Sequence, residues 1–522
     1  MLGATPSKEA HVAEETTAIP SVTPTADRPA TRRETDSLGS RDVPSDAYWG
    51  IHTLRAIENF PIANRPISVY SDLVIALAVV KQAAARANVE IGVLDPRKAH
   101  AIEASCEEIR GGALHDEFRV GVMQGGAGTS TNMNSNEVIA NRALEILGHE
   151  RGQYEFLHPI DDVNRSQSTN DTYPTAIKLA MSLALARLVD ELGRLADAFG
   201  VKGLEFRDVL KVGRTQLQDA VPMTLGQEFT GFAHTLGEDQ QRLRDTLPLL
   251  AEINLGATAI GTGITADPKY AEAVRRHLSD LSGIEMVTAP DLIEATSDAG
   301  VYMTVSGALK RSAIKLSKIC NDLRLLSSGP QAGFGEITLP PRQAGSSIMP
   351  GKVNPVIPEV VNQVAFAIAG ADVTVTMAAE AGQLQLNAFE PVIANSVLQS
   401  IQWLTRSCET LRVNCVDGIQ ANTARLAQQV ETNIGVVTAL TPYIGYAAAA
   451  SIAHTALATE TSIATLVVAA GLMSEEQVEH VLSPARLSGL EAITSSIPVV
   501  TAEQITAHLA SLDAAHADET TG

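Results

Sequence analysis

The fold class is decided by residues 171–200, which read DTYPTAIKLAMSLALARLVDELGRLADAFG. Their apolar residues recur at spacings of three and four, as in an amphipathic helix, and we expect this helix to end at Gly200. Long patterns of the same kind cover residues 72–91, 96–110, 222–250, 298–327, 356–382 and 388–415. Helices of this length are typical of an extended bundle, and no pattern of alternating strands and helices accompanies them. The chain is therefore predicted to be mainly α.

The composition limits the classes of protein to which this chain can belong. The 522 residues are enough for a large core and for two or three domains. A net charge of −21 argues against nucleic acid and anionic membranes as partners. The sequence has no run of eighteen apolar residues, so we expect no membrane span. The four cysteines show neither CxxC spacing nor a cluster with histidine, which predicts a reduced, cytoplasmic protein without structural zinc.

Both ends of the chain differ from the middle. Residues 1–34 are rich in Thr, Ala, Pro, Glu and Ser and lack the cationic start and apolar core of a secretory signal. We predict a disordered tail there. Residues 491–522 mix apolar and acidic residues and form a predicted C-terminal extension, compatible with one more helix.

One loop carries the densest set of candidate ligand groups. Residues 345–355 read GSSIMPGKVNP, and the two glycines and two prolines favour a structured loop. Ser346 and Ser347 offer hydroxyls, while Lys352 and Asn354 are suited to hold a carboxylate by a charge and an amide hydrogen bond. For the loop taken alone, a polar surface turn is an equally good interpretation.

Three further stretches combine glycine with short polar side chains. They are GGAGTSTNMN at 125–134, HPIDDVNRSQSTND at 158–171 and GRTQLQD at 213–219. Glycine lets a backbone approach a ligand, and Ser, Thr and Asn give directional hydrogen bonds to carboxylates. The glycine run lacks the GxxxxGK[ST] pattern of a phosphate loop, and no strand precedes it. Ser168 and its neighbours also suit a helix N-cap, a role compatible with anion binding.

In this order along the chain, these motifs resemble the aspartase/fumarase superfamily, and within it the aspartase branch. The similarity runs from about residue 38 to about residue 489. Branch-specific stretches include AYWGIHTLRA at 47–56, GRTQLQDAVPMTLGQE at 213–228, ICNDLRLLSSGP at 319–330 and TMAAEAGQLQLN at 376–387. Class II fumarases typically carry GSGTQ-like residues at positions 126–130 and NPTQCE at 354–359, where this chain has GAGTS and NPVIPE.

The resemblance implies a three-domain architecture. A mostly helical N-terminal domain would span residues 35–168, a central helical bundle 169–423, and a small helical C-terminal domain 424–490. Four central bundles would associate into a homotetramer with a core of about twenty helices. Active sites in this family are shared by three subunits, which fits the wide sequence separation of the motifs.

The resemblance also implies a reaction, the reversible elimination of ammonia from L-aspartate to give fumarate through an enediolate-like intermediate. Ser346 would be the general base, with Lys352 as the nearby cation that favours its alkoxide. The alternative is that Ser346 only caps a turn. The remaining substrate contacts would be Thr129, Ser168, Thr169 and Ser347 at the β-carboxylate, Lys352 and Asn354 at the α-carboxylate, and Asn170 and Thr215 near the amino group.

Gln216 departs from the pattern of fumarases and some aspartases, which carry histidine there. Glutamine is not an acid or base near neutral pH, so a relay between His and Glu359 is unavailable. Other aspartases share the glutamine, so the change favours aspartase over fumarase and leaves the acid that would assist the leaving group unassigned. Gln216 is a substrate-binding candidate. We expect ammonia to leave directly from the protonated amine.

Other functions remain as alternatives. A class II fumarase is the runner-up; a lyase acting on argininosuccinate, adenylosuccinate or 3-methylaspartate, and a non-catalytic crystallin-like protein, are further ones. The expected partners are L-aspartate, fumarate and ammonium, with no nucleic acid and no membrane. No organic cofactor or metal is implied, and activation by a divalent cation stays open.

Overall fold

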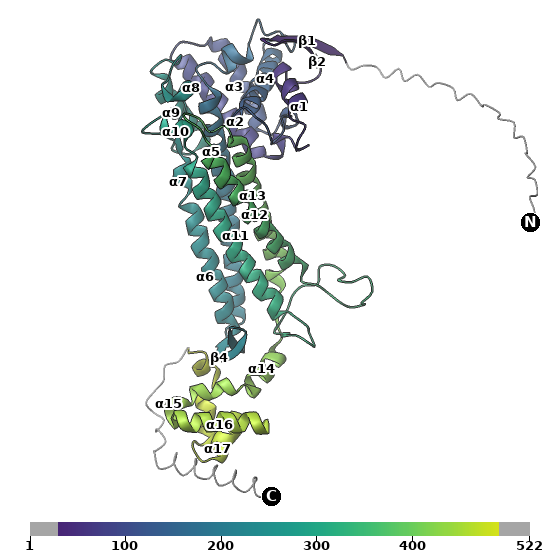
Figure 1. Ribbon diagram of the computed structural model, residues 1–522, viewed down its shortest axis with the longest axis vertical. Coiled ribbons are helices and arrows are strands. Elements are labelled where there is room, and N and C mark those ends of the chain that lie inside the picture. Colours follow the sequence, from purple (N-terminus) through teal and green to yellow (C-terminus); the bar gives the residue numbers. More distant parts are fainter. Residues whose placement is uncertain (1–29, 490–522) are drawn as a thin grey trace, which may run out of the picture.

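The computed structural model describes residues 30–489. In Figure 1 a long bundle of helices connects a helical head at one end to a small helical unit at the other. The mainly α prediction is confirmed. The described strands form four two-stranded sheets.

The head is built mainly from helices, together with an N-terminal hairpin. The helix α2 (Ser71–Glu90) is buried along most of its length and packs against α3 (Pro96–Arg110) and α9 (Tyr270–Ser282). The other elements are α1 (Ile51–Asn59), α4 (Thr129–Ile146), α7 (Leu247–Leu250), α8 (Thr258–Gly261) and α10 (Glu294–Ser297), with the parallel pair β5 (Glu252–Ile253) and β6 (Val287–Thr288).

The hairpin corrects the predicted N-terminal tail, which extends too far into the chain. Residues Thr31–Asp36 form β1, which pairs antiparallel with β2 (Gly39–Pro44). Arg32 donates to the carbonyl oxygens of Ala47 (2.7 Å) and Trp49 (2.6 Å), and Glu34 accepts from the backbone N–H of Ile51 (2.8 Å). These polar contacts order a segment that has few apolar residues. Residues 1–29 and 490–522 lie outside the described part, and with them the rest of that tail and the extension.

Five helices make the bundle. They are α5 (Thr169–Glu205), α6 (Leu225–Arg244), α11 (Gly300–Leu326), α12 (Val356–Glu380) and α13 (Glu390–Asn414). The 37 residues of α5 span about 55 Å at 1.5 Å per residue. Its end was predicted wrongly, because the helix continues through Gly200 to Glu205 and packs there against α6. Tertiary packing outweighs the weak helix propensity of one glycine.

The helix predicted at 222–250 is also wrong at both ends. Residues Gln218–Thr224 form β4, which pairs antiparallel with β3 (Leu210–Thr215), and Thr224 then caps α6. The helix ends at Arg244, before the separate turn of α7. This hairpin lies at the end of the bundle that is remote from the head (Figure 1).

A small C-terminal unit has its own core, built around Leu440, Ile452 and Val467. Its helices are α15 (Thr441–Ile444), α16 (Tyr446–Thr459), α17 (Ile463–Ala469), α18 (Glu475–Val481) and α19 (Pro484–Leu487). The preceding helix, α14 (Thr423–Thr432), packs against β3, and its Leu426 belongs to the main core. Asn433 Nδ2 donates to Asp219 Oδ2 (2.9 Å), which fastens the unit to the hairpin. The short pair β7 (Ile337–Thr338) and β8 (Gln420–Ala421) closes the same end of the bundle.

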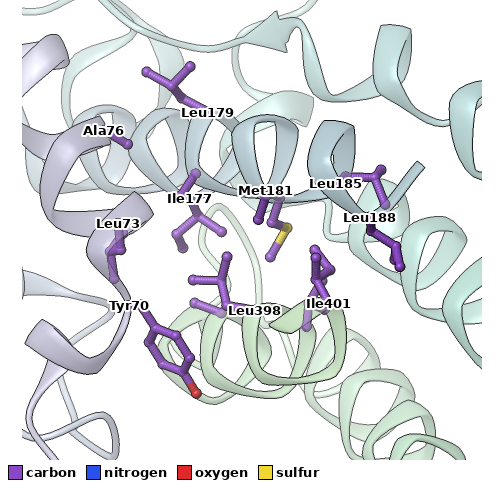
Figure 2. Packing of buried hydrophobic residues seen from close by; sticks show 14 of the residues in the cluster. Tyr70, Leu73, Ala76, Ile177, Leu179, Met181, Leu185, Leu188, Leu398 and Ile401 are labelled. Carbon is purple, nitrogen blue, oxygen red and sulfur yellow. The ribbon is translucent and has the colours of Figure 1, made fainter. Parts of the chain in front are cut away.

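The interior of the bundle is apolar. Figure 2 shows Leu73 of α2, Ile177 of α5 and Leu398 of α13 converging in one packed cluster. The domain boundaries at 168/169 and 423/424 stay a prediction.

The outer face of α12 is apolar as well. Phe366, Val373 and Met377 are 64%, 58% and 67% exposed. Their spacings of seven and four residues place them on one side of the helix. By length and composition α12 is apolar enough to cross a membrane, and only 33% of its most apolar window is buried in the single chain. Because α12 packs lengthwise against α11 and α13, we assign it to the bundle. An exposed apolar stripe of this kind is typical of an interaction surface.

Candidate active site

The loop between α11 and α12 places backbone N–H groups around the predicted base. Ser346 Oγ accepts hydrogen bonds from the N–H of Ile348 (3.2 Å) and of Met349 (3.0 Å). As a neutral hydroxyl, Ser346 thereby caps a turn, as in the alternative interpretation. The same two donors would stabilise an alkoxide at Oγ, because charge-assisted hydrogen bonds are stronger than neutral ones. The geometry therefore suits both roles.

The loop closes on itself through its two ends. The N–H of Gly345 donates to the carbonyl of Lys352 (2.9 Å), and Asn354 Nδ2 donates to the carbonyl of Gly345 (2.9 Å). A Cβ on Gly345 would lie 2.5 Å from the Lys352 oxygen, so only glycine permits this approach. Lys352, Asn354 and the two serines are thus held on one loop that projects from the bundle (Figure 1).

A second group of predicted residues lies where α5 begins. Ser168 is the N-cap: its Oγ accepts from the N–H of Asn170 (3.2 Å), and Asp171 accepts from the N–H of Ser168 (3.0 Å). This capping box confirms the N-cap interpretation. Burial raises the pKa of Asp171 to about 6 despite the backbone hydrogen bonds that it accepts. A helix N-terminus also favours anions, so Ser168 and Thr169 remain suited to a carboxylate ligand.

The start of α4 meets the start of α5. Thr129 is the first residue of α4, and Asn132 Nδ2 donates to Thr169 Oγ1 (3.1 Å). Gly128 has φ +86°, and a Cβ on it would lie 2.1 Å from the ring of Tyr173, so glycine is required for this contact. The structure thus gathers Thr129, Ser168, Thr169 and Asn170 at two adjoining helix N-termini.

A buried lysine that the sequence analysis missed lies beneath these helix ends. Lys81 is fully buried, and its Nζ donates to Asn132 Oδ1 (2.7 Å), Asn164 Oδ1 (2.9 Å) and Gln167 Oε1 (2.9 Å). Burial lowers the pKa of this ammonium to about 7, and the carboxylate of Asp171 opposes the shift. Because an ammonium has only donors, all three amides turn their oxygens toward it. The NH2 group of Asn132 is then left to hold Thr169.

The third group sits at the tip of the β3–β4 hairpin. Gln216 and Leu217 form a two-residue turn with φ of 54° and 61°, and Thr215 is the last residue of β3. All three are exposed, and Leu217 is 65% exposed. Both left-handed positions are occupied by residues other than glycine, which is uncommon in such a turn.

A single chain does not bring the three groups together. Thr169 begins α5, whereas Thr215 follows the far end of that helix, about 55 Å away along its axis. The Ser346 loop follows α11. The helix α11 starts beside α5 near the head, where the Tyr302 hydroxyl donates to the Pro174 carbonyl (3.5 Å), and it runs from there toward the hairpin end of the bundle. Among residues 30–489, no group of three or more His, Cys, Asp or Glu side chains is placed to hold a metal ion.

Comparison with known proteins identifies the class to which this helical bundle belongs, the lyases. Residues 39–370 match the family described as Lyase, and residues 436–489 match the family described as Fumarase C C-terminus. The chain therefore belongs to the aspartase/fumarase family of lyases.

Relatives within that family are similar over most of their length. The aspartate ammonia-lyase of Pseudomonas fluorescens is 58% identical, with 87% of this chain and 95% of the relative aligned. That of Escherichia coli K12 is 52% identical over the same 87% and over 95% of the relative. Among solved structures, a fumarate lyase:delta crystallin from Brucella melitensis, bound to cobalt, has a TM-score of 0.86 and 55% identity, covering 88% of this chain and 100% of that chain. A class II fumarase from Schistosoma mansoni has a TM-score of 0.83 at 32% identity, covering 89% and 100%.

Proposed function

We propose that the chain catalyses the reversible elimination of ammonia from L-aspartate to give fumarate. The observation that carries this proposal is the identity of 52–58% to aspartate ammonia-lyases over 87% of the chain. The fumarase alternative is weaker, since the S. mansoni fumarase is 32% identical. Gln216 also removes the histidine on which a fumarase-like relay would depend.

The reaction must take a weakly acidic proton from the carbon beside the β-carboxylate. Ser346 is the proposed base, and the N–H groups of Ile348 and Met349, which already contact its Oγ, support an alkoxide there. Loss of the proton places a second negative charge on the β-carboxylate. Stabilising that charge with preorganised donors is the largest catalytic requirement, and losing one donor of this kind costs about 3–4 kcal/mol. Those donors are Thr129, Ser168, Thr169 and Ser347.

The other end of the substrate needs a cation and an amide. Lys352 and Asn354 would hold the α-carboxylate, and Asn170 and Thr215 would lie near the amino group. The carbon–nitrogen bond breaks with its electron pair going to nitrogen, so the protonated amine leaves as neutral ammonia without an acid. Gln216 would only contact the substrate.

The site would be completed by three chains of a homotetramer. L-Aspartate is only a few ångströms long, whereas Thr169 and Thr215 of one chain are separated by the length of α5, about 55 Å. Residues so far apart would meet at one substrate only if they come from different chains. The apolar stripe of Phe366, Val373 and Met377 on α12 supports association through the bundle. We place the tetramer in the cytoplasm, with no organic cofactor.

The forward reaction tests the assignment. Incubation with L-aspartate should release fumarate, seen by its ultraviolet absorbance, together with an equal amount of ammonia. Ser346→Ala should abolish turnover while the tetramer and its melting temperature are retained. If Ser346→Ala has lost turnover but still exchanges the β-proton of the substrate with solvent deuterium, proton transfer does not need Ser346, and Ser346 is excluded as the base.

A further inference from the structure

A buried network of charges lies directly beneath the hairpin that carries Thr215 and Gln216. Glu336 is fully buried, and its Oε2 lies 2.8 Å from Lys211 Nζ. Its Oε1 pairs with a guanidinium nitrogen of Arg214. Lys211 also pairs with Glu228 Oε2 at 2.6 Å. The network thus joins β3 to α6 and to the segment that follows α11.

Arg214 is fixed on two sides. Its guanidinium carbon lies 4.3 Å from the centre of the Phe334 ring, while one of its nitrogens pairs with Glu336. The side chain of Arg214 is only 15% exposed. Because side chains alternate across a strand, an inward-facing Arg214 sends the next residue, Thr215, to the opposite face. The placement of Arg214 therefore determines where Thr215 points.

Glu336 belongs to the stem of the Ser346 loop. Its N–H donates to the carbonyl of Leu326 at the end of α11 (2.9 Å), and its carbonyl accepts from the N–H of Asn422 (2.9 Å). The next residues, Ile337 and Thr338, pair with β8, and the loop itself begins after them. One carboxylate thus connects the hairpin to the anchored stem of the loop that carries the base.

We propose that Arg214 and Glu336 are positioning residues that set Thr215 and Gln216 against the amine end of the substrate. This inference rests on the proposed function, which places the hairpin near the amino group. A buried ion network is a poor device for stability alone, because an apolar replacement of similar volume is often equally stable. The guanidinium of Arg214, which stacks on Phe334 and pairs with Glu336, instead fixes the orientation of the strand. A site built on an exposed hairpin tip needs such support.

The reverse reaction separates positioning from general stability. Glu336→Gln keeps the shape of the side chain but leaves Arg214 and Lys211 without their shared anion. We expect the KM for ammonium to rise about tenfold, while the KM for fumarate changes less than about threefold. Fumarate is bound by its carboxylates, which other segments hold. Arg214→Lys keeps the charge but loses the planar fork, and should show the same selective shift to a smaller degree.

A matched control is available in the middle of the bundle. Asp239 of α6 is fully buried, lies 2.6 Å from a guanidinium nitrogen of Arg311 and 3.7 Å from Lys315 Nζ, and contacts no predicted site residue. Asp239→Asn removes a buried carboxylate from the same kind of pairing. We expect a lowered melting temperature with both KM values unchanged.

The outcomes are distinct. The inference would be overturned if folded tetramers of both Glu336→Gln and Arg214→Lys kept the native ratio of the KM for ammonium to the KM for fumarate. If Glu336→Gln does not fold, Arg214→Lys decides the question alone. If the native protein itself makes no aspartate from fumarate and ammonium, the proposed function fails instead.

Discussion

Subunit mixing is the sharpest consequence of the separation between the three groups of site residues. Ser346→Ala damages the loop, and Thr169→Val removes a hydroxyl at the start of α5. Each variant alone should lose at least about a hundredfold in kcat, because each removes a group that acts in the transition state. In a tetramer built from both variants, a shared site can take its Ser346 from one chain and its Thr169 from another.

The expected recovery follows from counting. In an equal, random mixture each of the two positions is intact with a probability of one half, so about one quarter of all sites are complete. The mixture should therefore show about one quarter of native activity, well above the background of either variant. Refolding the two chains together, with a size tag on one, allows native mass spectrometry to verify the mixed tetramers.

A second mixture serves as the control. Ser346→Ala and Lys352→Ala both damage the same loop, so no chain in their mixture supplies an intact one, and activity should stay at background. The reasoning would be refuted if verified mixed tetramers of Ser346→Ala and Thr169→Val were no more active than the average of their parents. That result would require the loop and the start of α5 to act within one chain.

The remaining predictions concern single residues. Gln216→Ala should raise the KM for L-aspartate yet leave measurable turnover, and complete loss of turnover in a folded tetramer would show that Gln216 takes part in the chemistry. Lys81→Met should lower kcat by about tenfold to a hundredfold, because Asn132 then no longer holds Thr169 in place; a native kcat would refute this. The pKa of Lys81 is about 7 in the folded chain, against an ordinary value of 10.5, so the unfolded chain binds more protons between these values. The native protein should therefore gain stability relative to Lys81→Met as pH rises from about 7 to about 10, as equilibrium unfolding would measure. Phe366→Glu should place a charge on the apolar stripe of α12 and shift the protein toward smaller species in light scattering, and an unchanged tetramer would place the interface elsewhere.

Much of the fold could be predicted because a single period runs through each long helix. The residues predicted at 96–110, 298–327 and 356–382 agree with α3, α11 and α12 to within a few positions. The hairpin at β3 and β4 was missed because its turn, Gln216-Leu217, lacks the Asn-Gly or Asp-Gly pair that signals a two-residue turn. Residues 222–224 were then assigned to the following helix.

The candidate site was less accessible from the sequence. The capping role of Ser168 could be predicted, since serine three residues before an acid is a local signal. Lys81 could not, because a lone lysine in a helical pattern is normally assigned to the solvent face, and only the packing of α2 shows that it is buried. The network of Arg214 and Glu336 joins residues far apart in the chain, and one sequence holds no signal for such a pair. The catalytic and binding roles of the predicted site residues stay predictions.

Product analysis from fumarate tests the central claim most directly. The purified protein is incubated with fumarate and ammonium, and separately with fumarate alone, and the products are identified by chromatography. We predict aspartate in the first incubation and no malate in the second. Malate formed from fumarate alone, without aspartate when ammonium is present, would contradict the assignment and identify a hydratase.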